Sequence, residues 1–309
     1  MMEFILEVKN LTKRFGPPAG GFTAVDDISF SIKEGEIVGF LGRNGAGKTT
    51  TISMLMGLLT PTSGTITVFG KDLQKHREEI LTQVNYSSAY INFPRRMSVY
   101  ENLKIFAYLY DIPNREKRIE EVIGLFNLFP LRNTQYNLLS AGQQTRVHVA
   151  KAFLNTPKIL FLDEPTAALD PETAHDVRKL IVDMQKSHKI SVLFTSHNMA
   201  EVEEICDRVI FIDGGKIIAE DTPWALAGRL TTSKINLLIK DGLKRTLEYA
   251  HQHNFSAQQD GRYVTVEIAD DDIVYFLNFL SEKGIVYQEI SIEPPTLEDY
   301  FLQQGKKKL

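Results

Sequence analysis

Residues 42–49 read Gly-Arg-Asn-Gly-Ala-Gly-Lys-Thr, a glycine-rich turn that matches the pattern G-x-x-x-x-G-K-[ST]. An apolar run, Glu36–Leu41, precedes the turn, and a helical pattern, Thr49–Met56, follows it. Glycines let the backbone curl until several N–H groups point at one anion, and the following helix adds its positive N-terminal end. A strand, a turn and a helix in this order predict a nucleotide-binding loop in an α/β fold.

Apolar runs and helical segments also alternate through much of the remaining chain. Ile159–Leu162 and Ile190–Phe194 are short apolar runs of the kind that form buried strands, and residues 98–130 carry apolar side chains spaced for helical faces. Near the N-terminus, Phe4–Val8 and Ile28–Ile32 alternate as strands do. This alternation predicts a sheet with parallel strands and helices on its faces.

The pattern changes near residues 231–233, Thr-Thr-Ser. Beyond them the sequence predicts strands and helices in a small α+β unit: strands at 235–240, 263–269 and 285–292, and helices at 242–253, 271–283 and 296–303. A chain of 309 residues is long enough for two domains. We therefore expect a main domain over residues 1–230 and an accessory domain over residues 231–309.

Charge and composition exclude several classes of protein. The net charge is −4, which argues against a protein that coats nucleic acid, and no nucleic-acid partner is expected. The single cysteine, Cys206, excludes an internal disulfide framework and fits a reducing compartment. No stretch approaches the roughly 18 apolar residues of a membrane span, and the N-terminus lacks the pattern of a signal peptide. We expect an intracellular chain without its own membrane span.

Four side chains are candidates for phosphate chemistry. Lys48 would reach the β- and γ-phosphates of a nucleotide, and the Thr49 hydroxyl would bind Mg²⁺. Asp163 and Glu164 end an apolar strand, and ligands gather at the carboxyl ends of parallel strands. Asp163 would orient Mg²⁺, and Glu164 would accept a proton from, or polarise, the attacking water. Read alone, Glu164 is also a plausible residue at the start of a helix.

Two further segments are candidate parts of the site only in combination with these residues. His197 follows the strand 190–194 and could donate to the γ-phosphate or hold the water in line, although a lone histidine there is usually structural. Leu139-Ser-Ala-Gly-Gln143 precedes a helix, with Ser140 as a candidate N-cap.

Taken together and in this order, the motifs resemble the ATPase subunit of an ATP-binding cassette (ABC) transporter. The Walker A motif is Gly42–Thr49, the signature is Leu139–Gln143, and Walker B is Ile159–Asp163 followed by Glu164. The resemblance runs from about Val8 to Trp224 and implies a P-loop NTPase cassette with a helical subdomain over about residues 86–157.

The resemblance implies a set of site residues and partners. Phe15 occupies the position that stacks on adenine, Asp170 closes the D-loop Ala168-Leu-Asp170, and His197 is the switch histidine. ATP and Mg²⁺ are the implied cofactors. Two cassettes would sandwich two ATPs, so that the signature of one completes the site of the other, which is a second copy of this chain or a related cassette. Implied nucleotide-binding residues are Phe15, Gly42, Arg43, Asn44, Gly45, Ala46, Gly47, Lys48, Thr49, Thr50, Ser140, Ala141, Gly142, Gln143 and Asp170; Glu164, His197 and Lys48 would be catalytic, and Thr49 and Asp163 would hold the metal.

The sequence departs from the family pattern at two positions. Ala141 replaces the first glycine of the signature, a small change that we expect function to survive. Ala89 stands where the family's Q-loop carries a glutamine that couples the ATP site to the membrane subunit. Because Glu164 and His197 are both present, we still expect an active ATPase; a nucleotide-binding module without turnover is the alternative that Ala89 leaves open.

Several stretches resemble exporter cassettes that work with a separate multispan permease. They are residues 195–208, Gly215–Ala219, Asp221–Pro223 and the ending Pro295–Leu302, which is similar to a small C-terminal domain of that branch. The implied location is cytoplasmic, peripheral on the membrane. An importer cassette with a regulatory C-terminal domain remains an alternative, and a soluble cassette ATPase acting on ribosomes or DNA is disfavoured because the chain carries one set of motifs.

Overall fold

The computed structural model describes residues 4–17, 20–88, 93–167 and 169–306. The chain divides into two compact units, Met1–Pro223 and Trp224–Leu309. Among the described residues, no helix combines the length and the apolar character needed to cross a membrane.

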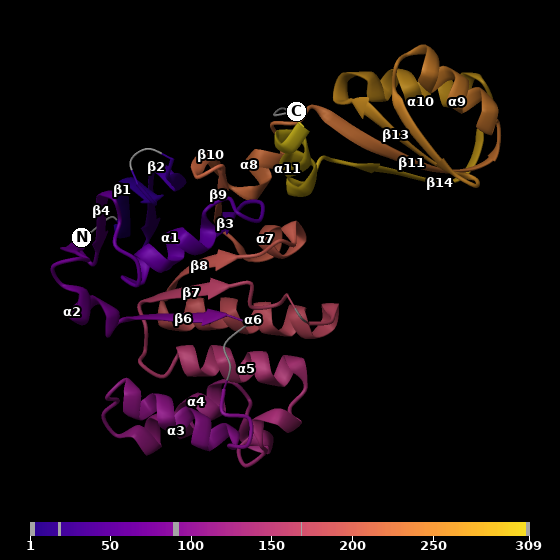
Figure 1. Ribbon diagram of the computed structural model, residues 1–309. Coiled ribbons are helices and arrows are strands. Elements are labelled where there is room, and N and C mark those ends of the chain that lie inside the picture. The colour runs from indigo at the N-terminus through magenta and orange to yellow at the C-terminus, as the bar shows by residue number, and fades with distance from the viewer. Residues whose placement is uncertain (1–3, 18–19, 89–92, 168, 307–309) are drawn as a thin grey trace. The chain divides into compact units, whose positions relative to one another are not determined.

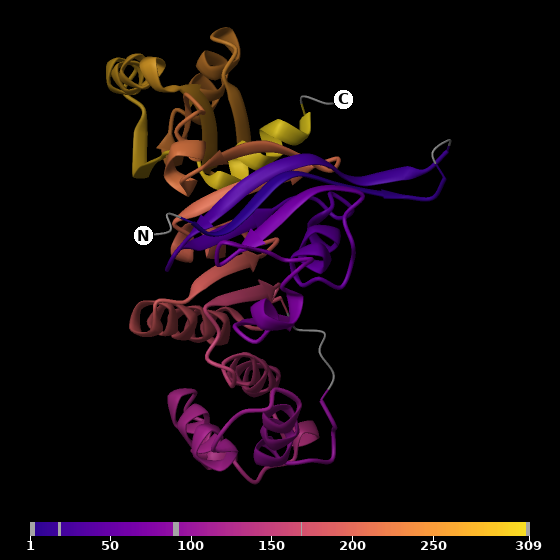
Figure 2. The ribbon, with the colours of Figure 1, turned by 90° about the vertical axis from the view of Figure 1, so that its left-hand side faces the viewer.

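Two sheets form the frame of the first unit (Figure 1). The antiparallel sheet has the order β2-β1-β4-β5, and Figure 2 shows its β1–β2 hairpin as a long ribbon that extends past the other strands. The second sheet has the order β10-β9-β3-β8-β7-β6 and is parallel except for β10. The strands are β1 (Phe4–Phe15), β2 (Phe22–Lys33), β3 (Ile37–Leu41), β4 (Ser63–Val68), β5 (Lys71–Asp72), β6 (Val84–Ser88), β7 (Ile159–Asp163), β8 (Ser191–Thr195), β9 (Arg208–Asp213) and β10 (Lys216–Asp221).

Helices follow the parallel strands in the manner that the sequence predicts. α1 (Lys48–Leu55) leaves β3, α6 (Pro171–His188) leaves β7, and α7 (Met199–Ile205) leaves β8. The short α2 (Arg77–Leu81) precedes β6, and α8 (Pro223–Ala227) begins where the first unit ends. The observed mixture of sheets and helices confirms the expected α/β fold class.

A group of helices occupies the segment between β6 and β7 (Figure 1). α3 (Val99–Leu109), α4 (Arg115–Leu125) and α5 (Ala141–Ala152) pack against one another, and α5 also contacts α6 and β6. Two short 3₁₀ turns, η1 (Phe129–Leu131) and η2 (Tyr136–Leu138), connect α4 to α5. The predicted helical stretch 98–130 is thus two helices.

The core of the first unit lies between its two sheets. β3 is buried at every position, and its Phe40 packs with Phe30 of β2 at a ring-centroid distance of 5.7 Å. Ile52, Met54 and Leu55 of α1 belong to the same cluster. Burial of this apolar surface stabilises the frame at roughly 25 cal/mol per Å². The phosphate loop therefore connects two buried elements, which fixes both of its ends.

The sole cysteine of the sequence is buried elsewhere in the first unit, beside Gly39 of β3. Cys206 is 8% exposed, and a Cβ built on Gly39 would lie 3.2 Å from its Sγ. Burial, with a smaller contribution from the charge of Asp207, raises the pKa of the thiol. Cys206 is thus a free, buried cysteine that packs in the interior.

The second unit is a βαββαβ arrangement, the ferredoxin-like motif. Its antiparallel sheet has the order β12-β13-β11-β14, with α9 and α10 on one face (Figure 1). A separate core joins that face to the helices through residues such as Ile235, Val266 and Phe276. The elements are β11 (Thr232–Asp241), α9 (Leu243–Gln252), β12 (Ser256–Asp260), β13 (Tyr263–Ala269), η3 (Asp270–Asp272), α10 (Ile273–Glu282), β14 (Val286–Glu293) and α11 (Leu297–Lys306).

Candidate functional site

The glycine-rich loop joins the buried end of β3 to the first turn of α1. Gly47, the residue before the helix, has φ 110°, a conformation that L side chains rarely adopt. A Cβ on Gly47 would lie 2.5 Å from the Ala24 carbonyl oxygen, and one on Gly42 would lie 2.3 Å from that of Ile212. These glycines are therefore required for the loop to close against β2 and β9, which leaves its backbone free to surround an anion.

Lys48 lies over this loop. Its Nζ donates to the carbonyl oxygens of Gly42 at 2.6 Å and Arg43 at 3.3 Å. Partial burial lowers the pKa of Lys48, and the negative charges of Glu164 and Asp163 oppose that shift. The amine thus lies between the loop and two carboxylates, where a phosphate group would supply a further counter-charge.

A cavity of about 430 Å³ opens beside the loop. Most of the predicted loop residues border it, together with the two predicted carboxylates; the lining comprises Phe22, Ala24, Arg43, Asn44, Gly45, Gly47, Lys48, Thr49, Thr50, Asp163 and Glu164. The volume is within the range usual for small-molecule sites. Gly42 and Ala46 shape the loop from beneath: Gly42 accepts from Lys48, and Ala46 is buried.

The carboxylates are held by the neighbouring strand β8. Thr195 donates its hydroxyl to Asp163 Oδ1 at 2.7 Å, and the Glu164 N–H reaches the same hydroxyl at 3.0 Å and the Thr195 carbonyl at 3.1 Å. His197 Nδ1 lies 3.1 Å from Glu164 Oε2, and the histidine side chain is 67% exposed. The structure therefore brings Asp163, Glu164 and His197 together, as the strand order required.

Tyr86 also belongs to this group, although the sequence motifs did not predict it as a site residue. Its hydroxyl donates to Asp163 Oδ2 at 3.2 Å. Burial raises the pKa of Tyr86, and the neighbouring charge of Asp163 also raises it, so the hydroxyl keeps its proton at neutral pH. Parallel pairing of β6 with β7, which aligns Ser88 with Asp163, was the signal that could have found it.

The aromatic residue at the cavity is Phe22, which the sequence reasoning did not select. Phe22 is 65% exposed and pairs with Phe15 across the β1–β2 hairpin. Phe15 is not part of the cavity lining, and its ring lies 5.2 Å from the Lys13 ammonium. The hairpin thus offers two exposed aromatic rings near one end.

The signature residues lie at the start of α5 and do not border this cavity. Ser140 is the N-cap, as expected: its Oγ accepts from the Gln143 N–H at 3.3 Å, while Gln143 Oε1 accepts from the Ser140 N–H at 3.0 Å. Ala141 opens the helix, and a Cβ on Gly142 would lie 2.1 Å from Thr173 Cγ2 of α6. The same glycine that the motif supplies is therefore needed for the close approach of α5 and α6.

Asp170 caps α6. Its Oδ1 accepts from the Thr173 N–H at 3.0 Å, and this hydrogen bond lowers the pKa of its carboxyl. Its D-loop neighbour Ala168 and the Q-loop position Ala89 lie outside the described residues.

The chemistry of the donor set fits a nucleotide with Mg²⁺. The described part of the chain contains no group of three or more His, Cys, Asp or Glu side chains arranged to hold a metal by themselves. Mg²⁺ is ordinarily bound by one or two protein oxygens together with substrate phosphates and waters. The Thr49 hydroxyl and Asp163 carboxylate on one cavity match that pattern.

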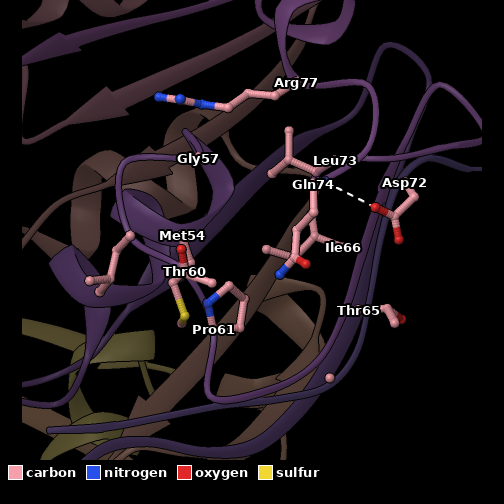
Figure 3. A pocket seen from close by; sticks show the side chains of 12 residues that line it. Met54, Gly57, Thr60, Pro61, Thr65, Ile66, Asp72, Leu73, Gln74 and Arg77 are labelled. Carbon is pink, nitrogen blue, oxygen red and sulfur yellow. Dashed lines mark hydrogen bonds between the residues drawn. The ribbon is translucent and has the colours of Figure 1, made fainter.

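A second hollow, of about 290 Å³, lies among α1, β4 and α2 (Figure 3). Asp72 at its border accepts the N–H groups of Gln74 and Lys75, each at 3.0 Å, so its carboxylate completes a local turn. Arg77, also at the border, is exposed. These groups do not converge on one ligand position as those of the phosphate loop do.

Comparison with known proteins gives a consistent result. Residues 25–167 match the family model described as ABC transporter. The chain is 32% identical over 305 residues to the bacitracin transport ATP-binding protein BcrA of Bacillus licheniformis, covering 98% of this chain and 97% of that protein. It is 35% identical to the methionine import ATP-binding protein MetN of Geobacillus kaustophilus, covering 70% of this chain and 65% of MetN.

A solved structure resembles the first unit in fold. It is a dimeric post-hydrolysis state of the ATP-binding cassette MJ0796 bound to ADP and Pi, with a TM-score of 0.63 and 25% identity, covering 70% of this chain and 98% of that one.

Proposed function

The chain belongs to the family of ABC transporter ATP-binding proteins, which hydrolyse ATP to drive transport, and we propose that it energises an exporter through a separate multispan permease. The observation that carries the proposal is the meeting of Lys48, Thr49, Asp163 and Glu164 around one cavity.

The phosphate loop binds the nucleotide. Backbone N–H groups of residues 43–49 and the N-terminus of α1 surround the phosphates, and Lys48 places its ammonium against them. The Thr49 hydroxyl and Asp163 hold Mg²⁺, which when bound neutralises charge on the phosphate oxygens. Gly42, Arg43, Asn44, Gly45, Ala46, Gly47 and Thr50 complete the loop, and Phe15 or its partner Phe22 supplies an aromatic surface for the base.

Glu164 and His197 act on the water. Glu164 accepts the proton of the attacking water, and His197, 3.1 Å from that carboxylate, orients the water and the terminal phosphate. The left-handed backbone of Glu164, φ 49°, and its two hydrogen bonds to Thr195 fix where the carboxylate points.

A second copy completes the site. Ser140, Ala141, Gly142, Gln143 and Asp170 are the remaining members of the proposed nucleotide-binding set, and they lie away from the cavity of their own chain. Their supply by a partner cassette accounts for this placement, and ABC ATP-binding subunits dimerise. The solved cassette of similar fold is itself a dimer.

Transport requires a membrane partner, because the described residues provide no spanning helix. The likeness to the bacitracin transport protein covers both units, whereas the likeness to the methionine import protein covers 70% of the chain. The exporter proposal is instead supported by the resemblance of residues 195–208 and of the ending Pro295–Leu302 to exporter cassettes that work with a separate permease. We place the chain on the cytoplasmic face of the membrane, as a homodimer of cassettes bound to the permease.

Replacement of Glu164 by Gln tests the catalytic assignment. The variant keeps the shape of the site but loses the proton acceptor, so we expect ATP hydrolysis to fall by roughly 10²–10⁴-fold while ATP binding persists. Hydrolysis is measured as phosphate release by the purified chain, with Glu116→Gln, on the exposed surface of α4, as the matched control. Hydrolysis at the parental rate by Glu164→Gln would rule out the assignment.

The membrane assignment is tested in cells. The full chain, affinity-purified from detergent-solubilised membranes, should carry a multispan polypeptide with it. Cells that carry Glu164→Gln in place of the parent should retain a compound that parental cells release to the medium. A compound depleted inside the cells and left in the medium would instead show import, and purification without any membrane polypeptide would contradict the transport role.

A further inference from the structure

The carboxylate of Asp163 is held at both of its oxygens. Thr195 of β8 donates to Oδ1 at 2.7 Å, and Tyr86 of β6 donates to Oδ2 at 3.2 Å. β7, which ends at Asp163, lies between those two strands in the sheet. Hydrogen bonds from opposite sides restrict rotation of the carboxylate, and therefore fix the direction in which its remaining lone pairs point.

Tyr86 is arranged as a donor to Asp163. The Ser88 side chain also hydrogen-bonds to the Tyr86 side chain. The Tyr86 ring is partly buried and packs against the core cluster of the first unit, at the position that pairs with Phe161 of β7. The contact therefore comes from a fixed strand position rather than from a mobile surface residue.

The backbone of Tyr86 is fixed from its other side by a buried ammonium. Lys151 of α5, 6% exposed, donates from Nζ to the Tyr86 carbonyl at 3.0 Å and to Asn85 Oδ1 at 3.4 Å. Asn85 donates in turn to Asn155 Oδ1 at 2.8 Å. Because α5 also carries the signature residues at its other end, one rigid path joins that helix, Tyr86 and Asp163.

We propose that Tyr86 is a positioning residue that sets the affinity of the nucleotide site for its divalent cation by orienting the Asp163 carboxylate. The inference rests on the proposed function, in which Asp163 is a ligand of Mg²⁺. Tyr86 itself is not among the residues that line the cavity. Loss of its hydroxyl releases Asp163 Oδ2, so that the carboxylate must be ordered again each time a cation binds.

The test uses the full chain with a non-hydrolysable ATP analogue and Mn²⁺ as the probe ion. Free Mn²⁺ is read from its paramagnetic resonance signal, which requires no turnover. We expect Tyr86→Phe to weaken Mn²⁺ binding by about 3- to 10-fold, less than the full contribution of a hydrogen bond to a charged group because Thr195 still holds Oδ1, and to leave the affinity for the analogue in EDTA unchanged. Tyr136→Phe is the matched control, because its hydroxyl pairs with His148 at 2.7 Å.

Asp163→Asn separates the metal-ligand role of Asp163 from the positioning role of Tyr86. If Asp163→Asn weakens Mn²⁺ binding strongly and Tyr86→Phe binds Mn²⁺ as the parent does, Asp163 is a metal ligand and the positioning role of Tyr86 is wrong. Undiminished Mn²⁺ binding by Asp163→Asn would overturn the metal assignment and the positioning role with it. An equal loss of analogue affinity in EDTA and of Mn²⁺ affinity in Tyr86→Phe would indicate general damage to the site and would also overturn the proposal.

Discussion

Single residues at the site hold unusual conformations that their neighbours enforce. Glu164 has φ 49°, a left-handed conformation that few non-glycine residues adopt and that costs of order 1–3 kcal/mol. Its N–H is shared between the carbonyl and the hydroxyl of Thr195. Strand β8 therefore supplies the stabilisation that keeps the proposed catalytic carboxylate on the cavity, and the position of Glu164 depends on a residue 31 positions away in the sequence.

A buried histidine makes stability depend on pH. Burial, with a smaller contribution from Lys151, lowers the pKa of His148 to about 4. An unfolded histidine titrates near 6.5. Between pH 6.5 and 4 the unfolded chain therefore binds more protons than the folded chain, and the free energy of unfolding decreases as the pH is lowered. When the pH is lowered from 7 to 4, the free energy of unfolding of His148→Phe should therefore decrease by about 1–3 kcal/mol less than that of the parent, as measured by urea unfolding.

The exposed His251 provides the control for that measurement. His251→Phe should follow the parental pH dependence. An unchanged dependence in His148→Phe would mean that the buried ring does not titrate in this range.

The individual residues show what sequence motifs can and cannot predict. Motif and strand context were enough to bring Asp163, Glu164 and His197 to one place, because all three follow parallel strands at the same edge of a sheet. Tyr86 and Phe22 were missed, because their roles depend on side-chain direction across a strand pair and across a hairpin. Neither residue belongs to a local pattern that distinguishes it from an ordinary strand aromatic.

At the level of elements, α5 and α6 can cross closely because Gly142 has no side chain. A Cβ on Gly142 would lie 2.1 Å from Thr173 Cγ2. The helices meet just where one begins with Ser140 as its cap and the other with Asp170. Two N-caps and a glycine thus determine how closely the helices approach.

Gly142→Ala should separate the two helices. We expect the free energy of unfolding to fall by roughly 1–3 kcal/mol, as overpacking usually costs. Thr173→Ser removes Cγ2 and keeps the hydroxyl, so the double variant should recover most of the lost stability in thermal unfolding. If the double variant is no more stable than Gly142→Ala alone, the loss does not arise from this contact.

The alternation of apolar residues decided which strands of the second unit could be predicted. The strand predicted at 263–269 matches β13, whose Val264, Val266 and Ile268 are all buried. β14 is exposed along its whole length, but its apolar Val286, Ile290 and Ile292 allowed a strand to be predicted at 285–292. β12, with the sequence Ser-Ala-Gln-Gln-Asp, was missed because it has no alternating apolar side chains. It is a strand only through its pairing with β13, a non-local cause that leaves no alternation in the sequence.

On the scale of the whole molecule, the chain has two separate cores. The first unit contains the phosphate loop, and the second has its own cluster within the ferredoxin-like motif. A ligand that binds one folded unit stabilises that unit by mass action and leaves an independent unit unchanged.

Calorimetry of the full chain should therefore show two unfolding transitions. ATP in EDTA, at a hundred times its dissociation constant, should add about 2.7 kcal/mol to the first unit and raise the midpoint of one transition only. A single transition that moves as a whole would mean that the two units unfold together.

The sealed environment of Cys206 also makes the chain convenient for thiol chemistry. The residue is 8% exposed and its thiol is packed beside Gly39, so maleimides and spin labels should not react with it while the protein is folded. A cysteine introduced on the surface would then be the one reactive handle on a native background. Probes placed on the β1–β2 hairpin and at the start of α5 could report the distance between cassettes during a catalytic cycle, without first removing the natural cysteine.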